Sequence, residues 1–304
     1  MRRYRVAVLG GDGREVHIAE RLAQDGHEAI RYGQGSSVPN GVRVATRLPD
    51  AVGGAEWLVL PSPGLNGDIV YAPDAPEPIV LGRALLEQSA VAGAGGIVLG
   101  RSNPTLDGLA AAMSIPLFEL KDDLGLATRL STGVAEGVLR LLIEVTRRIL
   151  REHRILVVGY GVTGAVILDH LVAVRCTPAV TTRHPRALER ARQCGATPVA
   201  YADRVAAMAD ADIVVNTVPS PDAVPREAFA ALRDRIVIDI ASPPGGIDHE
   251  AARAAGVQVH WPRGLAGGRA PLTAGDAQYA FVARAMAARQ SVPATIASSE
   301  GGPA

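Results

Sequence analysis

Three glycines in the second half of the chain have the spacing of a phosphate-binding turn. Gly159, Gly161 and Gly164 follow an apolar run and form Gly-x-Gly-x-x-Gly ahead of a helical pattern that begins with Val162 and Thr163. In such a turn the first glycine permits a tight bend, the second lets the backbone approach a pyrophosphate, and the third lets the helix lie close to the strand. The free N–H groups of that helix start can bind phosphate. The motif predicts a dinucleotide site.

The end of the next strand pattern indicates which dinucleotide binds. An NAD site carries Asp or Glu there, which binds the 2′-hydroxyl of the adenosine ribose. Here the strand expected over Ala179–Thr182 runs into Arg183 without an acid. Thr182 can donate to a 2′-phosphate, and Arg183 can pair with it through its fork of donors. Arg183 could also be a solvated loop cation, but the missing carboxylate favours NADP over NAD.

Two later strand patterns end in segments suited to a nicotinamide pocket, Asn216–Ser220 and Asp239–Gly246. The carboxyl ends of parallel strands meet at the edge where open α/β sheets bind ligands. Ordinary turn chemistry explains the Pro and Gly residues of these segments equally well. The residues expected to contact the cofactor are therefore Gly159, Gly161, Val162, Thr163, Gly164, Thr182, Arg183, Thr217, Val218, Pro219 and Ala241.

Candidate substrate and acid–base residues are more scattered. The turn Gly10-Gly11-Asp12-Gly13-Arg14 lacks phosphate-loop spacing, but its N–H groups and Arg14 could receive a carboxylate. The other residues expected to bind substrate are Arg101, Ser242 and Gly245. The candidate proton acceptors are Glu136 and Lys121, the single lysine of a chain that otherwise uses arginine. Lys121 also begins a Lys-Asp-Asp run typical of solvated surface. The histidines show no metal spacing, so no metal site is expected.

The elements that must position these residues form two series of alternating strand and helix patterns. Such alternation predicts an α/β protein with two doubly wound domains, the second a Rossmann fold. The expected order is a substrate domain over 1–130, a linking helix over 131–152, the NADP-binding domain over 153–271, a helix over 272–289, and a disordered tail over 290–304. Residues 61–78, rich in Pro, Gly and Asp, are expected to form a long surface loop.

The two helices that flank the second domain predict its connection to the first. The chain crosses between the domains twice, and Gly264, Gly267 and Gly268 would give the second crossing backbone freedom. The helix over 272–289 carries an apolar set that a complete Rossmann sheet need not bury, so we expect it to pack on the first domain or the linking helix. A cleft between the domains is the expected active site.

Bulk properties exclude several classes of protein. The chain has 304 residues, of which 48% are hydrophobic and 4% aromatic, and its formal net charge is zero. A neutral chain offers no electrostatic case for a nucleic-acid or anionic-membrane partner. Cys176 and Cys194 belong to no metal-spaced cluster, and no apolar run has the length of a membrane span. A cytoplasmic protein is expected.

Taken in order, these segments resemble the dipicolinate synthase A-subunit family over almost the whole chain. The resemblance rests on residues 8–14, 117–119, 136–137, 159–164, 216–220, 239–242 and 264–275. In layout the family is similar to methylenetetrahydrofolate and D-2-hydroxyacid dehydrogenases. The resemblance implies NADP-linked oxidation of dihydrodipicolinate, or of its hydroxylated tetrahydro precursor, in the mother cell of a spore-forming bacterium. A flavoprotein-like B-subunit would be the partner, and a homo-oligomer is possible.

Three positions depart from the family pattern near the expected substrate site. Leu130 stands for an Asn, Val134 for a Thr, and Pro243 for an Arg. These departures leave cofactor binding intact but keep two alternatives open. One is an NAD(P)-dependent dehydrogenase for another small carboxylate. The other is a catalytically silent NADP-binding protein that regulates or scaffolds a partner.

Overall fold

The computed structural model describes residues 2–35, 40–242, 245–262 and 264–290, which fall into two compact units. The first unit contains the described parts of Met1–Gly11, Glu15–Leu120 and Asp276–Ala304, and the second those of Asp12–Arg14 and Lys121–Gly275. Each unit is an α/β fold around its own parallel sheet. The predicted fold class is confirmed.

The sheet of the first unit has the strand order β3-β2-β1-β4-β7-β8, with every neighbouring pair parallel. Taken in sequence order these strands read 3-2-1-4-5-6, the order of a dinucleotide-binding sheet. The elements are β1 (Arg5–Leu9), α1 (Gly13–Gln24), β2 (Glu28–Tyr32), β3 (Arg43–Val44), α2 (Leu48–Val52), β4 (Trp57–Val59), β5 (Leu65–Asn66), β6 (Ile69–Val70), α3 (Arg83–Gln88), α4 (Val91–Ala94), β7 (Gly96–Leu99), α5 (Pro104–Ala112) and β8 (Leu117–Glu119).

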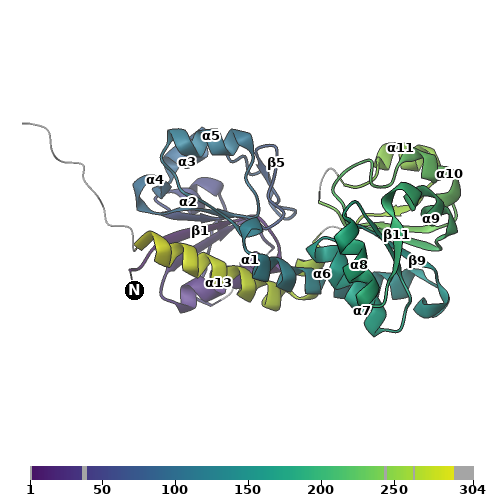
Figure 1. The fold of residues 1–304 in the computed structure, drawn as a ribbon. Coiled ribbons are helices and arrows are strands. Elements are labelled where there is room, and N and C mark those ends of the chain that lie inside the picture. Colours follow the sequence, from purple (N-terminus) through teal and green to yellow (C-terminus); the bar gives the residue numbers. More distant parts are fainter. Residues whose placement is uncertain (1, 36–39, 243–244, 263, 291–304) are drawn as a thin grey trace, which may run out of the picture. The chain divides into compact units, whose positions relative to one another are not determined.

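Helices cover both faces of this sheet, which is why its central strands β1, β4 and β7 are mostly apolar. Ala7, Leu9 and Ile30 pack against α2, α3, α4 and α5 on one face. The other face carries α1 and α13 (Pro271–Gln290) (Figure 1). The stretch 61–78, expected to be only a loop, contains the antiparallel hairpin β5–β6, in which Leu65 pairs with Val70. Two-residue strands are too short to leave a periodic pattern in the sequence.

Polar contacts join the last helix to α1 within the first unit. His17 Nε2 lies 2.9 Å from Asp276 Oδ1, and Arg21 forms a salt bridge with the same carboxylate. These partners hold the pKa of Asp276 below its usual value, the His17 hydrogen bond contributing most. The Arg21 guanidinium also stacks on the Tyr279 ring, 4.8 Å from its centroid. The part of α13 from Asp276 on thus belongs to the first unit.

The second unit contains a six-stranded parallel sheet in the order β11-β10-β9-β12-β13-β14, again 3-2-1-4-5-6 by sequence. The strand predicted over Ala179–Thr182 is present as β10. The elements are η1 (Leu120–Asp122, which spans the boundary between the units), α6 (Leu124–Val145), η2 (Leu150–Glu152), β9 (Ile155–Val158), α7 (Val162–Ala173), β10 (Ala179–Thr182), α8 (Pro185–Gln193), β11 (Thr197–Ala200), η3 (Tyr201–Asp203), α9 (Arg204–Asp210), β12 (Ile213–Asn216), η4 (Arg226–Ala228), α10 (Phe229–Leu232), β13 (Ile236–Asp239), α11 (His249–Ala254), β14 (Val259–His260) and α12 (Leu265–Arg269).

Alternate residues of the central strands face two apolar layers. Val157 and Val215 pack with α6, α7 and α8, whereas Leu156 and Val214 pack with α9, α10 and α11. The helix predicted over 131–152 is α6, but its bounds are wrong. It begins at Leu124, where the Asp123 side chain caps the first turn by accepting from Leu126 N at 2.8 Å, and it ends at Val145.

The Gly/Pro-rich segment before the last helix is also more regular than expected. Residues Leu265–Arg269 form α12, which packs on α6 at Gly137, where an added Cβ would lie 2.9 Å from Leu265 Cδ2. Gly267 approaches the Asp12 carboxylate so closely that a Cβ there would lie well inside 3.0 Å of it. Close packing therefore accounts for Gly137 and Gly267. Residues 291–304, most of the expected tail, lie outside the described residues, and no helix of the described part is long and apolar enough to cross a membrane.

Candidate cofactor site

The glycine turn forms one wall of a cavity of about 330 Å³ at the carboxyl edge of the second sheet. The cavity brings together most of the residues expected to contact a cofactor. Its lining consists of Gly159, Tyr160, Gly161, Val162, Thr163, Gly164, Thr181, Thr182, Arg183, His184, Tyr201, Thr217, Val218 and Pro219. Ala241 is not part of this lining. The edge lies where strand order reverses around β9, the ligand position of doubly wound folds.

The three glycines serve the turn in different ways. Gly159 has φ +100°, and a Cβ there would meet Val218 Cγ2 at 2.6 Å. A Cβ at Gly164 would lie well inside 3.0 Å of the Gly159 carbonyl oxygen. Gly161 is different, because a Cβ there would meet nothing within 4 Å. The protein itself therefore has no packing need for a glycine at Gly161, whereas a ligand held against its backbone would have one.

A contact from α6 supports the end of the cavity that the glycine turn forms. The buried Ser131 hydroxyl lies 2.9 Å from Thr163 Oγ1 at the start of α7. Across the turn, Thr217 Oγ1 donates to the Val158 carbonyl at 2.9 Å. Sequence reasoning missed Ser131, because nothing in its own helix signals a contact with a residue 32 positions away.

The opposite end of the cavity is formed by β10 and the segment after β11. Thr182 is 8% exposed, and Arg183 and His184 are exposed. No carboxylate side chain is among the residues that line the cavity. Tyr160 lies with its hydroxyl 3.8 Å from Cys194 Sγ, and burial together with this contact raises the Tyr160 pKa to about 12.

A buried carboxylate organises the two turns that follow β12 and β13. Asp239, 0% exposed, accepts from Asn216 Nδ2 at 2.8 Å, Ala241 N at 3.1 Å and Gly246 N at 2.8 Å. Its Oδ2 also lies 3.1 Å from His249 Nε2. A buried carboxylate needs such donors to offset its lost hydration. The sequence predicted that Asp239 lies at the carboxyl edge of the sheet, but not that its hydrogen-bond donors come from two separate turns.

The candidate substrate residues Ser242 and Gly245 lie in the second of these turns. Ser242 is exposed. Gly245 has φ +92°, and a Cβ there would lie 2.8 Å from both Asp239 Oδ2 and His249 Nε2. The His249 ring in turn stacks on Trp261, with centroids 4.0 Å apart. The close approach of the Gly245 backbone to Asp239 and His249 thus explains why this position is a glycine.

The remaining candidates are not gathered by this cavity. Arg14 is 3% exposed, and its Nε and Nη2 donate to the two Asp12 carboxylate oxygens at 2.9 and 2.8 Å. Lys121 and Glu136 are exposed on η1 and α6 of the second unit. Arg101 is exposed after β7 in the first unit. Of the positions that depart from the family pattern, Leu130 and Val134 are half-buried on α6, and Pro243 lies outside the described residues.

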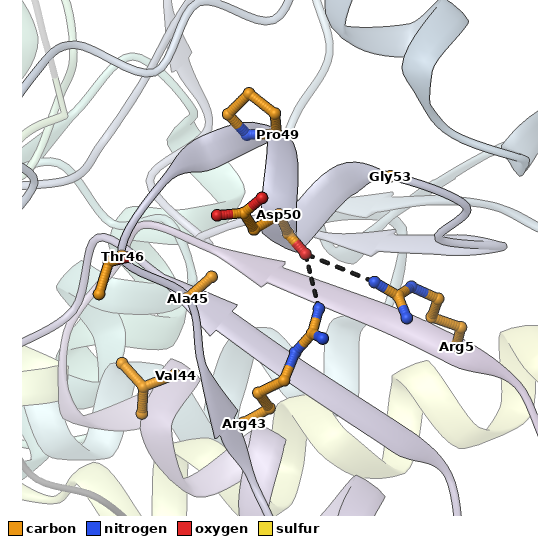
Figure 2. Close-up of a pocket in the computed structure, with 8 residues that line it drawn as sticks. All are labelled: Arg5, Arg43, Val44, Ala45, Thr46, Pro49, Asp50 and Gly53. Carbon is orange, nitrogen blue, oxygen red and sulfur yellow. Dashed lines mark hydrogen bonds between the residues drawn. The ribbon is translucent and has the colours of Figure 1, made fainter.

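A second cavity, of about 410 Å³, lies in the first unit beside β3 and α2. Figure 2 shows two of its arginines converging on the Asp50 carbonyl oxygen, with Arg43 Nη2 at 2.7 Å and Arg5 Nη2 at 3.4 Å. Arg5 also pairs with Glu28 at 2.7 Å. The two cations offset the negative carbonyl end of α2. The arginines of this cavity thus hold α2 against the sheet.

Comparison with known proteins assigns different relatives to the two halves. Residues 5–121 match the family model for the N-terminal domain of the dipicolinate synthase A-subunit. Residues 143–261 match the family described as shikimate/quinate 5-dehydrogenase. The first match covers the strand and helix series of the first unit, and the second covers β9 to β14.

Whole-chain relatives combine both halves. The dipicolinate synthase A-subunit of Bacillus subtilis is 26% identical over 284 residues, covering 90% of this chain and 92% of the relative. The crystal structure of its Bacillus halodurans counterpart has a TM-score of 0.77 at 25% identity and covers 93% of this chain and 97% of that chain. A transhydrogenase from Sinorhizobium meliloti shares the fold, with a TM-score of 0.61 at 16% identity, over 92% of this chain and 93% of its own. The resemblance predicted from the sequence is therefore confirmed.

Proposed function

We propose that this relative of the dipicolinate synthase A-subunit is an NADP-dependent oxidoreductase that forms dipicolinate from dihydrodipicolinate or from its hydroxylated tetrahydro precursor. The observation that carries the cofactor part is the cavity built by the glycine turn. Its open space at Gly161 fits a pyrophosphate, and a threonine and an arginine stand at the ribose end, where NAD sites carry an acid. The substrate part rests on the N-terminal family match and the whole-chain relatives.

The chain's own groups would bind and orient the cofactor and the substrate. The N–H groups at the start of α7 face the pyrophosphate, and Thr182 and Arg183 bind the 2′-phosphate. Bound NADP⁺ supplies an acceptor for the hydride that leaves the ring of dihydrodipicolinate. A proton leaves with it, and the ring becomes aromatic. From the hydroxylated precursor, one water must be lost as well.

For the substrate, Arg14, Arg101, Ser242 and Gly245 remain the proposed carboxylate-binding residues. Glu136 and Lys121 remain the proposed proton acceptors. To bind a substrate carboxylate, Arg14 would have to give up its ion pair with Asp12. A flavoprotein-like B-subunit is the proposed partner.

The test measures absorbance at 340 nm with purified chain, NADP⁺ and dihydrodipicolinate, with and without the flavoprotein-like partner. We expect NADPH to form, and NADP(H) to bind more tightly than NAD(H) in calorimetry. Arg183→Asp should reduce or reverse the preference for NADP(H) over NAD(H). The control is Arg233→Asp, which changes an exposed arginine directly after α10 and should leave the preference unchanged. Equal affinities for the two cofactors in the parent would refute NADP selectivity. If the chain binds NADPH tightly but shows no turnover with or without the partner, the proposed activity is refuted, and the chain is a catalytically silent NADP-binding protein.

A further inference from the structure

The ribose end of the cavity contains an aromatic ring that no motif explains. Tyr201, the first residue of η3, lines the cavity together with Thr182 and Arg183. Ala200, the residue before it, pairs in register with Thr182 on the neighbouring parallel strand. Tyr201 and Arg183 therefore leave adjacent strands at the same level and on the same edge of the sheet.

The ring is held from behind by an arginine. Arg204 Cζ lies 4.3 Å from the centroid of the Tyr201 ring, and Arg204 Nη1 donates to the Tyr201 carbonyl at 3.2 Å. The hydrogen bond fixes the guanidinium, and the cation–π contact fixes the ring. Because Arg204 covers one face of the ring, a flat ligand can stack only on the other.

The strand order decides which part of a dinucleotide reaches this ring. Tyr201 follows β11, whereas Thr217, Val218 and the Asp239 turn follow β12 and β13 on the other side of β9. A dinucleotide bound across β9 with its pyrophosphate on the glycine turn places one nucleoside on each side. The side with Thr182 and Arg183 is that of the adenosine ribose.

We infer that Tyr201 is the platform on which the adenine base stacks, and that Arg204 is a positioning residue that holds this platform and adds positive charge beside the 2′-phosphate. The inference rests on the proposed cofactor. Stacking of a base on an aromatic side chain is worth about fivefold to hundredfold in affinity. A cation behind the ring adds attraction for an anion, which should favour ligands that carry a 2′-phosphate over those that do not.

The experiment uses calorimetry on the full chain with 2′,5′-ADP, which lacks nicotinamide, and 5′-AMP, which also lacks the 2′-phosphate. Tyr201→Leu, which keeps bulk but removes the π face, should lose about fivefold to hundredfold of the affinity for both ligands. Tyr201→Phe should stay within about twofold of the parent, because it keeps the ring. Arg204→Gln should weaken 2′,5′-ADP more than 5′-AMP. The control for Arg204→Gln is Arg233→Gln. Arg233 also donates to a backbone carbonyl, that of Ala255, but it does not line the cavity.

The outcomes separate this inference from the proposed function. Parent-like binding of 2′,5′-ADP by Tyr201→Leu, with NADPH still bound by the parent, overturns the platform alone. Failure of the parent to bind either 2′,5′-ADP or NADPH overturns the proposed function, and the platform with it. Circular dichroism melting checks folding, and if Tyr201→Leu unfolds, the Tyr201→Phe and Arg204→Gln affinities decide the result. An equal loss for the two ligands in Arg204→Gln refutes the charge contribution.

Discussion

A side chain added at Gly161 should weaken NADPH binding without destabilising the protein, whereas one added at Gly164 should destabilise it. Gly161 adopts an extended backbone, with φ −79° and ψ −169°, that any residue can adopt, and its Cβ position is open. Gly161→Val should therefore change the stability of the cofactor-free protein by no more than about 1 kcal/mol, the balance of backbone entropy and helix capping. At Gly164 the added Cβ of Gly164→Ala would clash with the Gly159 backbone, so part of the turn must move.

The expected magnitudes follow from these surroundings. Forced overpacking costs about 1–3 kcal/mol, which for a domain of this size lowers the melting temperature by about 2–12 °C. Gly161→Val should melt within about 4 °C of the parent by the same scaling. Its branched side chain, however, occupies the place of the pyrophosphate. Losing two charge-assisted hydrogen bonds, at about 1.5–3 kcal/mol each, should reduce NADPH affinity by about hundredfold or more.

Differential scanning fluorimetry without cofactor and calorimetry with NADPH measure the two effects separately. The reasoning is refuted if Gly161→Val melts as low as Gly164→Ala, because the open space would then not exist. It is also refuted if Gly161→Val binds NADPH like the parent, because the phosphates would then lie elsewhere. Gly82→Val controls for glycine replacement as such, because Gly82 is also an extended residue before a helix with an open Cβ position and lies outside the cavity lining.

Three further results are expected. Ser131→Ala should lower NADPH affinity by about twofold to tenfold, because it removes one hydrogen bond that holds Thr163, with little change in melting temperature; an unchanged affinity would contradict this. Asp239→Asn places an amide against buried donors and should cost about 2–4 kcal/mol in urea unfolding, whereas the exposed Asp222→Asn should cost almost nothing. Asp212→Asn should lose about 1–2 kcal/mol at pH 7, because hydrogen bonds from Arg154 lower the Asp212 pKa from 3.8 to about 2. Since the pKa of Asp212 is lower in the folded than in the unfolded protein, this stabilisation is present above pH 4 and disappears as the pH falls toward 2. A difference in stability between the parent and Asp212→Asn that persists unchanged at low pH would contradict this explanation.

Local patterns in the sequence were enough to predict the second unit. The apolar runs of its strands, the glycine spacing and the missing acid after Thr182 are features of neighbouring residues, and the glycine turn and the end of β10 line the same cavity. The alternation of strands and helices likewise predicted two doubly wound folds. The hairpin β5–β6 was missed, because the Pro, Gly and Asp residues around its short strands favoured a loop.

Only the tertiary structure decided which distant groups meet. Asp12 neutralises Arg14, Asp239 collects donors from Asn216 and the turn to His249, and Arg204 stacks behind Tyr201. The sequence shows each of these groups but not its partner. Buried polar side chains are hydrogen-bonded, and the fold rather than the local sequence determines which groups lie close enough to bond. The same holds for Gly137, whose glycine is required by α12, more than 120 residues later in the chain. Residue type and spacing predicted most of the residues that line the cavity, whereas long-range packing determined which distant side chains pair with each other.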